Sequence, residues 1–167
     1  MKKSIMALAI IAAAFGQKAF AQTDTSSVFK NVITSYLDIK NALTSDDGDG
    51  AAVAAGQLFD ALNDMPADSL RSQHETWARY HQKPSPEAMQ IKTANDIDIQ
   101  REHFKKLSSD MYTMLKSLEL NNVVLYYDYC PMAKAYWVSE KRGIVNPYLG
   151  QSMPTCGSVE DTLRAYR

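Results

Sequence analysis

The sequence predicts a mainly α-helical domain, a four-helix up-down bundle that carries a short C-terminal β-hairpin and a coiled tail. Three observations lead to this fold class. Apolar residues recur at helical spacing through four segments, short connections rich in Gly, Pro and Asp separate them, and β-branched and aromatic residues concentrate after residue 122. Because short connections make consecutive amphipathic helices antiparallel neighbours, an up-down bundle is the expected packing.

The four helices follow from the apolar stripes and the breaks between them. A cap at Ser26 or Ser27 predicts the start of the first helix. The Pro-Ser-Pro run after Lys83 predicts a stop after the third. The last helix has the longest apolar stripe. It covers 97–118, and its start is expected between Glu87 and Ile97. The expected helices are 25–44, 51–63, 68–81 and 97–118.

Two short strands are expected after the helices, at 123–129 and 136–138, with residues 130–134 between them. Turn signals at 142–143 and 146–150 predict an irregular tail beyond the second strand. An isolated hairpin is marginally stable in water, so we expect this hairpin to pack on the bundle.

The first 21 residues have the pattern of a signal peptide. Lys2 and Lys3 precede an apolar stretch too short to span a bilayer, and the triplet at 19–21 has small residues at both ends. We expect cleavage after Ala21, a single domain at 22–167, and export, most simply to a bacterial periplasm; an uncleaved anchor is the alternative. No later segment is apolar enough for a membrane helix, so no membrane insertion is expected after cleavage.

The net charge and the absence of common enzyme motifs limit the kinds of function that the sequence supports. Removal of the leader leaves 15 basic against 19 acidic residues, a net charge of −4. This balance disfavours nucleic acid and anionic lipid as partners, whereas it permits a cationic ligand. The chain also lacks the Ser-nucleophile, phosphate-loop and dinucleotide motifs of common enzymes. We therefore expect a binding protein and not an enzyme.

Two sulfur-bearing turns are the strongest chemical signal in the chain. One contains Cys130 and Met132 on either side of a proline, and the other contains Met153 and Cys156. Proline favours an extended conformation at Cys130, which directs residues 130 and 132 to the same side. Two thiolates and two thioethers form a soft donor set that suits Cu(I), with Ag(I) as the related ion, better than zinc or hard cations.

The residues alone leave other readings of these turns open. In an oxidising compartment, Cys130 and Cys156 could instead form a structural disulfide in a non-enzymatic interaction module. The methionines would then be ordinary packing residues. Redox chemistry at the two thiols is a third reading.

Two further features have weaker signals. His103, next to the apolar stripe of the last helix, is an optional fifth metal donor, although a surface histidine is the simpler interpretation. The acidic run at 46–50 lacks the closing Glu of a calcium loop and is interpreted as a solvated helix connection.

Several segments together are similar to a known family. They are Cys-Pro-Met-Ala at 130–133, Trp-Val-Ser at 137–139, the run 144–150, Met153, Cys-Gly at 156–157 and the helical segment 101–108. On these residues the chain resembles the DUF3347 family, a small exported domain that also occurs fused to periplasmic adaptor subunits of copper and silver efflux pumps.

The resemblance implies heavy-metal handling in the periplasm, with copper as the expected metal. It also implies an efflux adaptor or pump as the expected partner. The positions that match the family motif are His103, Cys130, Met132, Met153 and Cys156.

Overall fold

The computed structural model describes residues 25–65, 70 and 72–166. In this part the protein is mainly helical and carries a small antiparallel sheet near its C-terminus. The helices are α1 (Thr25–Thr44), α2 (Gly48–Asn63), α3 (His74–Tyr80), α4 (Pro84–Thr93) and α5 (Ile97–Leu118). The strands are β1 (Leu125–Cys130), β2 (Ala135–Ser139) and β3 (Ser158–Leu163), and the short 3₁₀ helix η2 (Gly150–Ser152) precedes β3. The expected signal peptide at 1–21 lies outside the described residues.

Local capping explains where the helices begin and end. At the start of α2, the carboxylate of Asp47 accepts a hydrogen bond of 2.8 Å from the N–H of Gly50. At the start of α5, the carboxylate of Asp96 accepts from the N–H groups of Asp98 and Ile99. Helix α5 ends where Glu119 takes a left-handed conformation with φ 53°. None of the helices among the described residues has the length and hydropathy needed to cross a membrane.

The predicted fourth helix is two helices, α4 and α5. The third helix ends at Tyr80, before the proline-rich run, as expected, but the same run also begins α4, with Pro84 at its first position. Proline fits there because the first helical residues have no intrahelical partner for their N–H groups. Residues 94–96 then leave the helical conformation, and the Asp96 cap starts a new helix.

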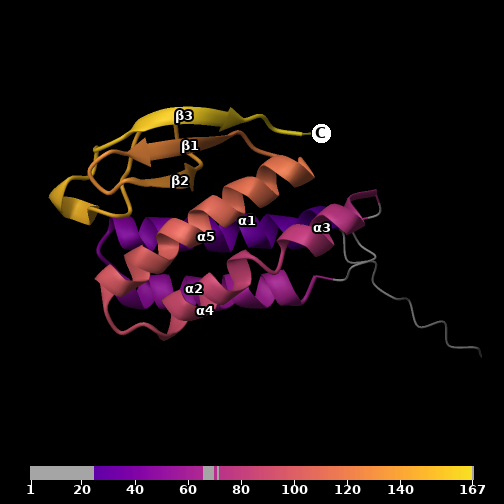
Figure 1. The fold of residues 1–167 in the computed structure, drawn as a ribbon, viewed down its shortest axis with the longest axis horizontal. Coiled ribbons are helices and arrows are strands. Elements are labelled where there is room, and N and C mark those ends of the chain that lie inside the picture. Colours follow the sequence, from indigo (N-terminus) through magenta and orange to yellow (C-terminus); the bar gives the residue numbers. More distant parts are fainter. Residues whose placement is uncertain (1–24, 66–69, 71, 167) are drawn as a thin grey trace, which may run out of the picture.

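The molecule has three layers (Figure 1). The sheet covers α1 and α5, and these two helices in turn cover α2 and α4. Helix α2 packs on both α1 and α4, and α5 packs on α3, α4 and β2. The sheet and α4 therefore lie on opposite sides of α5.

The sheet has the strand order β2-β1-β3, with both pairs antiparallel. The hairpin of β1 and β2 confirms the two predicted strands, whereas the expectation of a coiled tail is wrong at 158–163. These residues are mostly exposed and have little apolar periodicity, so their own pattern did not indicate a strand. They form one because β1 offers them a free edge for backbone hydrogen bonds.

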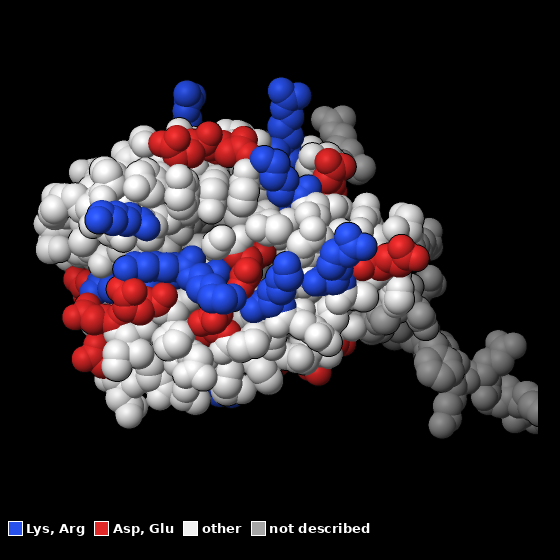
Figure 2. All heavy atoms as spheres, viewed as in Figure 1, with Lys and Arg blue, Asp and Glu red and all other residues white. Residues whose placement is uncertain are grey.

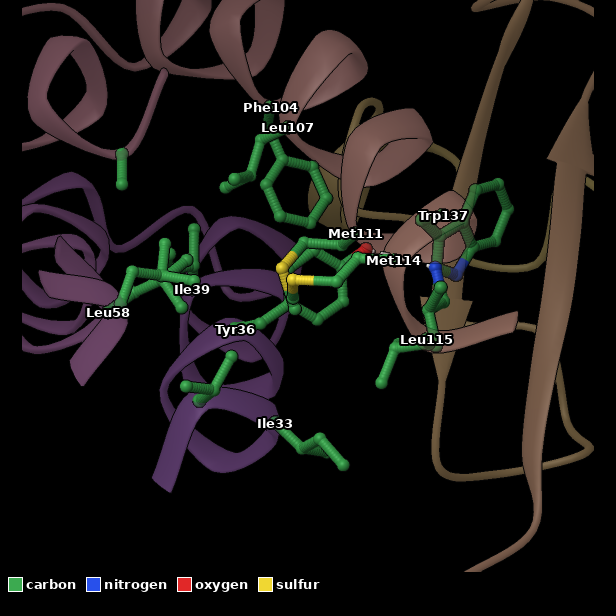
Figure 3. Close-up of a cluster of buried hydrophobic side chains, with 14 of the residues drawn as sticks. Ile33, Tyr36, Ile39, Leu58, Phe104, Leu107, Met111, Met114, Leu115 and Trp137 are labelled. Atoms are coloured by element: carbon green, nitrogen blue, oxygen red, sulfur yellow. Dashed lines mark hydrogen bonds between the residues drawn. The ribbon is translucent and has the colours of Figure 1, made fainter. Parts of the chain in front are cut away.

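One hydrophobic core extends from the sheet through α1 and α5 to α2 and α4. Figure 3 shows Met111 and Met114 of α5 gathered with Tyr36 of α1, and all three are fully buried. The Tyr36 hydroxyl contacts the Ser108 hydroxyl at 2.8 Å and accepts a hydrogen bond of 2.9 Å from the N–H of Val138 in β2. The same tyrosine therefore connects both helices to the sheet.

Among the buried polar groups of the described residues, the carboxylate of Asp128 stands out because neither of its oxygens has a partner. Both carboxylate oxygens of Asp128 in β1 lack a hydrogen-bond partner, and its side chain is 0% exposed. The charged groups that face it are Lys40 and Glu140, which form an ion pair of 2.7 Å. Burial raises the pKa of Asp128 to about 7; Lys40 opposes this shift and Glu140 adds to it.

Asp128 should therefore make the folded state less stable as the pH rises. Its pKa is raised above the ordinary value of 3.8, so stability present in acid is lost between about pH 4 and pH 7. Asp128→Asn should remove this loss and stabilise the protein at neutral pH by on the order of 2 kcal/mol relative to wild type. Urea unfolding at several pH values measures the difference. Asp38→Asn, which changes an exposed carboxyl on α1, is the control, and equal pH profiles for wild type and Asp128→Asn would contradict the assignment.

Candidate functional site

The topology of the sheet brings the two cysteines together. Cys130 is the last residue of β1, and Cys156 lies just before β3, which pairs with β1 through Tyr129 and Ser158. Their sulfur atoms are 2.9 Å apart, and both thiols are free. Two turns whose cysteines are 26 residues apart in the chain therefore meet at their thiols.

Asn146 organises the loop that carries Cys156. Its side-chain amide donates a hydrogen bond of 2.7 Å to the Cys156 carbonyl, and its amide oxygen accepts from the N–H groups of Tyr148 and Leu149. Its backbone N–H donates to the Pro154 carbonyl at 2.8 Å. Asn146 is fully buried, so these hydrogen bonds are shielded from water. From the sequence, this residue was interpreted only as part of a turn.

Gly157 allows the segment after Cys156 to lie flat on the sheet. Its φ is 146°, and a Cβ at this position would meet the Tyr129 carbonyl at 2.8 Å and the Trp137 ring at 2.9 Å. Any larger residue would push the chain away from β1, and Cys156 with it.

A second set of contacts fixes the beginning of the same loop. Arg101 of α5 donates to the Pro147 carbonyl and to the Leu43 carbonyl, both at 3.0 Å, and forms an ion pair with Asp46. Asp46 also accepts from the N–H of Gln151 at 3.1 Å. The acidic run between α1 and α2 thus has structural roles, in agreement with its interpretation as a helix connection.

The two thiols have different electrostatic environments. Burial alone would raise the pKa of the Cys130 thiol, but hydrogen bonds from the Cys156 thiol and from the N–H of Ala133, 3.4 Å away, outweigh it and hold this pKa below its ordinary value. Donation to Cys130 raises the pKa of the Cys156 thiol. The pair therefore loses its first proton as a shared thiol–thiolate in which Cys130 carries the charge.

The methionines flank the thiols on exposed turns. Met132 is 62% exposed and Met153 is 40% exposed. The N–H of Cys156 donates to the Met153 carbonyl at 3.3 Å, so this turn is closed by its own backbone. Both side chains are open to solvent and neither is part of the hydrophobic core.

His103 is on α5, where its side chain contacts α4 and not the loop that carries the thiols. Its Nδ1 is 2.9 Å from a carboxylate oxygen of Glu87 in α4, and Figure 1 shows that α4 and the sheet lie on opposite sides of α5. The contacts of Cys130 and Cys156 are with each other, with β1 and β2 and with the loop around Asn146. Within residues 25–65, 70 and 72–166, no three His, Cys, Asp or Glu side chains gather at metal-binding distance.

Surface charges near α5 largely pair with one another. Figure 2 shows a band of Lys and Arg across this face, with Asp and Glu beside it. Ion pairs of 2.6 Å join Lys105 to Glu102 and Lys106 to Asp110. An open groove of about 500 Å³ between α1 and α2 is lined by polar side chains and Ala61, and none of the predicted site residues is among them.

Comparison with known proteins finds one family. A family model described as a protein of unknown function (DUF3347) matches residues 32–122. The matched segment includes His103 and ends before Cys130. No curated protein and no solved structure matches the chain.

Replacement of Asn146 should separate the two cysteines. Asn146→Ala removes the three side-chain hydrogen bonds of the loop and should lower the free energy of unfolding by about 2 kcal/mol. It should also slow formation of the Cys130–Cys156 disulfide by oxidised glutathione, because Cys156 is no longer held against Cys130. Urea unfolding of the reduced protein and thiol counting over time measure the two effects.

Asn122→Ala is the matched control, since Asn122 is exposed. It should leave both quantities unchanged. If Asn146→Ala oxidises as fast as wild type, another contact positions Cys156.

Proposed function

This chain belongs to the DUF3347 family, and from the geometry of its two thiols we propose that it binds Cu(I), with Ag(I) as an alternative cargo. The observation that carries the proposal is the meeting of Cys130 and Cys156 at 2.9 Å, on turns that also carry the exposed Met132 and Met153. Soft monovalent ions favour thiolate and thioether donors.

The state of the Cys130 thiol supports ion capture. A metal ligand must lose its proton, and Cys130 is already the more acidic of the two thiols. Binding would then release the proton that Cys156 shares with it. Because a thioether does not protonate in the physiological range, the two methionines remain available as donors at any such pH.

The ion would need the two sulfurs to move apart. With metal–sulfur distances of roughly 2.3 Å, two thiolates on one tetrahedral ion lie about 3.8 Å from each other. Cys156 is the thiol that would move, because it is partly exposed and follows an exposed turn, whereas Cys130 is 0% exposed. His103 is left out of this donor set because it pairs with Glu87 on the other side of α5.

The cellular role proposed here follows from the resemblance described above. We propose an exported, periplasmic protein that buffers the metal or delivers it to an efflux system, with a binding rather than a catalytic role.

A second candidate is an interaction module in which a Cys130–Cys156 disulfide pins the tail to the sheet. The sulfur separation is consistent with this candidate as well, since 2.9 Å is shorter than two thiolates on one ion require but longer than a disulfide bond of about 2.05 Å. The exposure of both methionines and the partial exposure of Cys156 favour metal binding, because a purely structural pair gains nothing from an open side.

Metal titration of reduced and oxidised protein distinguishes the two candidates. The reduced protein should bind one Cu(I) per chain in competition with a chromogenic chelator, and the oxidised protein should bind none, since the disulfide removes both thiolates. Equal uptake by both forms, or no uptake by the reduced form, would rule out the thiol site.

Matched variants test the individual donors. Met132→Leu and Met153→Leu keep the side-chain volume and should each weaken binding by roughly tenfold, about 1.4 kcal/mol. Cys130→Ala should abolish it. Met89→Leu on α4 and His103→Gln are the controls and should leave the affinity at the wild-type value.

A further inference from the structure

The two cysteines of the site differ in their exposure to solvent. This difference matters for a reaction that needs no metal. The Cys130 residue is fully buried at the end of β1, whereas Cys156 is partly exposed and follows three exposed residues, Met153, Pro154 and Thr155. A second molecule that carries a thiol or a disulfide can therefore approach the sulfur of Cys156 and not that of Cys130.

We propose that the Cys130–Cys156 pair undergoes thiol–disulfide exchange with external dithiols, with Cys156 as the attacked sulfur and Cys130 as the buried leaving and resolving sulfur. The geometry that supports this is the short sulfur–sulfur distance of 2.9 Å together with the one-sided exposure of the pair. The substrate class is a dithiol, either a small molecule or a protein with two neighbouring cysteines.

The exchange balances in two steps. In the oxidised protein, a thiolate of the external dithiol attacks Cys156 Sγ, a mixed disulfide forms, and the Cys130–Cys156 bond breaks with its electron pair on Cys130. The second thiolate of the dithiol then attacks its own bound sulfur and releases Cys156, which takes up a proton. The protein disulfide is thus reduced to two thiols while the dithiol is oxidised to a disulfide.

The surroundings of Cys130 suit the leaving role. The N–H of Ala133 points to Cys130 Sγ at 3.4 Å, so the departing thiolate has a donor in place before the bond breaks.

The short distance between the two sulfurs also allows the reverse step. When Cys156 carries a mixed disulfide, the Cys130 thiolate lies next to it and can attack Cys156 Sγ, which expels the external thiolate. The buried cysteine therefore acts only within the chain.

Trapping of the mixed disulfide tests which sulfur is attacked. Oxidised wild-type protein, freed of metal with a chelator, is mixed briefly with glutathione, quenched with acid and alkylated. The two cysteines fall in separate tryptic peptides, 117–134 and 143–164. We expect at least tenfold more glutathione on the peptide with Cys156 than on the peptide with Cys130.

Single-cysteine variants give an independent measurement with glutathione disulfide. Cys130→Ser, which keeps Cys156, should form the adduct at least tenfold faster than Cys156→Ser, which keeps Cys130, and the two rates should converge in urea. Adduct formation mainly on Cys130, equal rates for the folded variants, or a wild-type disulfide that glutathione does not open would each overturn the proposal. Because no metal is present, a failure here is separate from a failure of Cu(I) binding.

Discussion

The hydrogen bonds of Asn146 are the constraint on which the candidate site depends. They close the loop between β2 and β3 onto itself and hold the Cys156 carbonyl at 2.7 Å from the Asn146 amide. Arg101 then ties the same loop to the end of α1. Because β3 pairs with β1 only after this loop has turned, one buried side chain links the outer strand to the position of the second thiol.

The face of the sheet that carries the thiols also carries buried polar groups without hydrogen-bond partners, which lower the stability of the fold. Asp128 is two residues before Cys130 in β1 and is buried without a partner, opposite Trp137, whose indole N–H is also unpartnered. A protein gains no stability from such groups. Most of the remaining interior is well-packed hydrocarbon, with Met111 and Met114 among it.

The predictions from sequence were most successful where a local signal decided the structure. The apolar stripe and polar flanks of α1 predicted its bounds, and the β-branched and aromatic run after residue 122 predicted β1. The separate helix α4 was missed for a local reason: the proline-rich run was interpreted only as the end of the helix before it, although proline also fits a first helical position. Strand β3 was missed because its partner edge, and not its own pattern, makes it a strand.

For the candidate site, too, some features followed from local sequence and others only from the tertiary structure. The sequence by itself determined the donor chemistry: two thiols and two thioethers on turns, because residue type decides which ions and reactions are open to a side chain. Only the tertiary structure decided that Cys130 and Cys156 meet, that Cys156 alone is accessible, and that His103 faces α4 instead. The physical reason is that these facts depend on strand pairing and loop closure between residues far apart in the chain, and no local pattern encodes such distances.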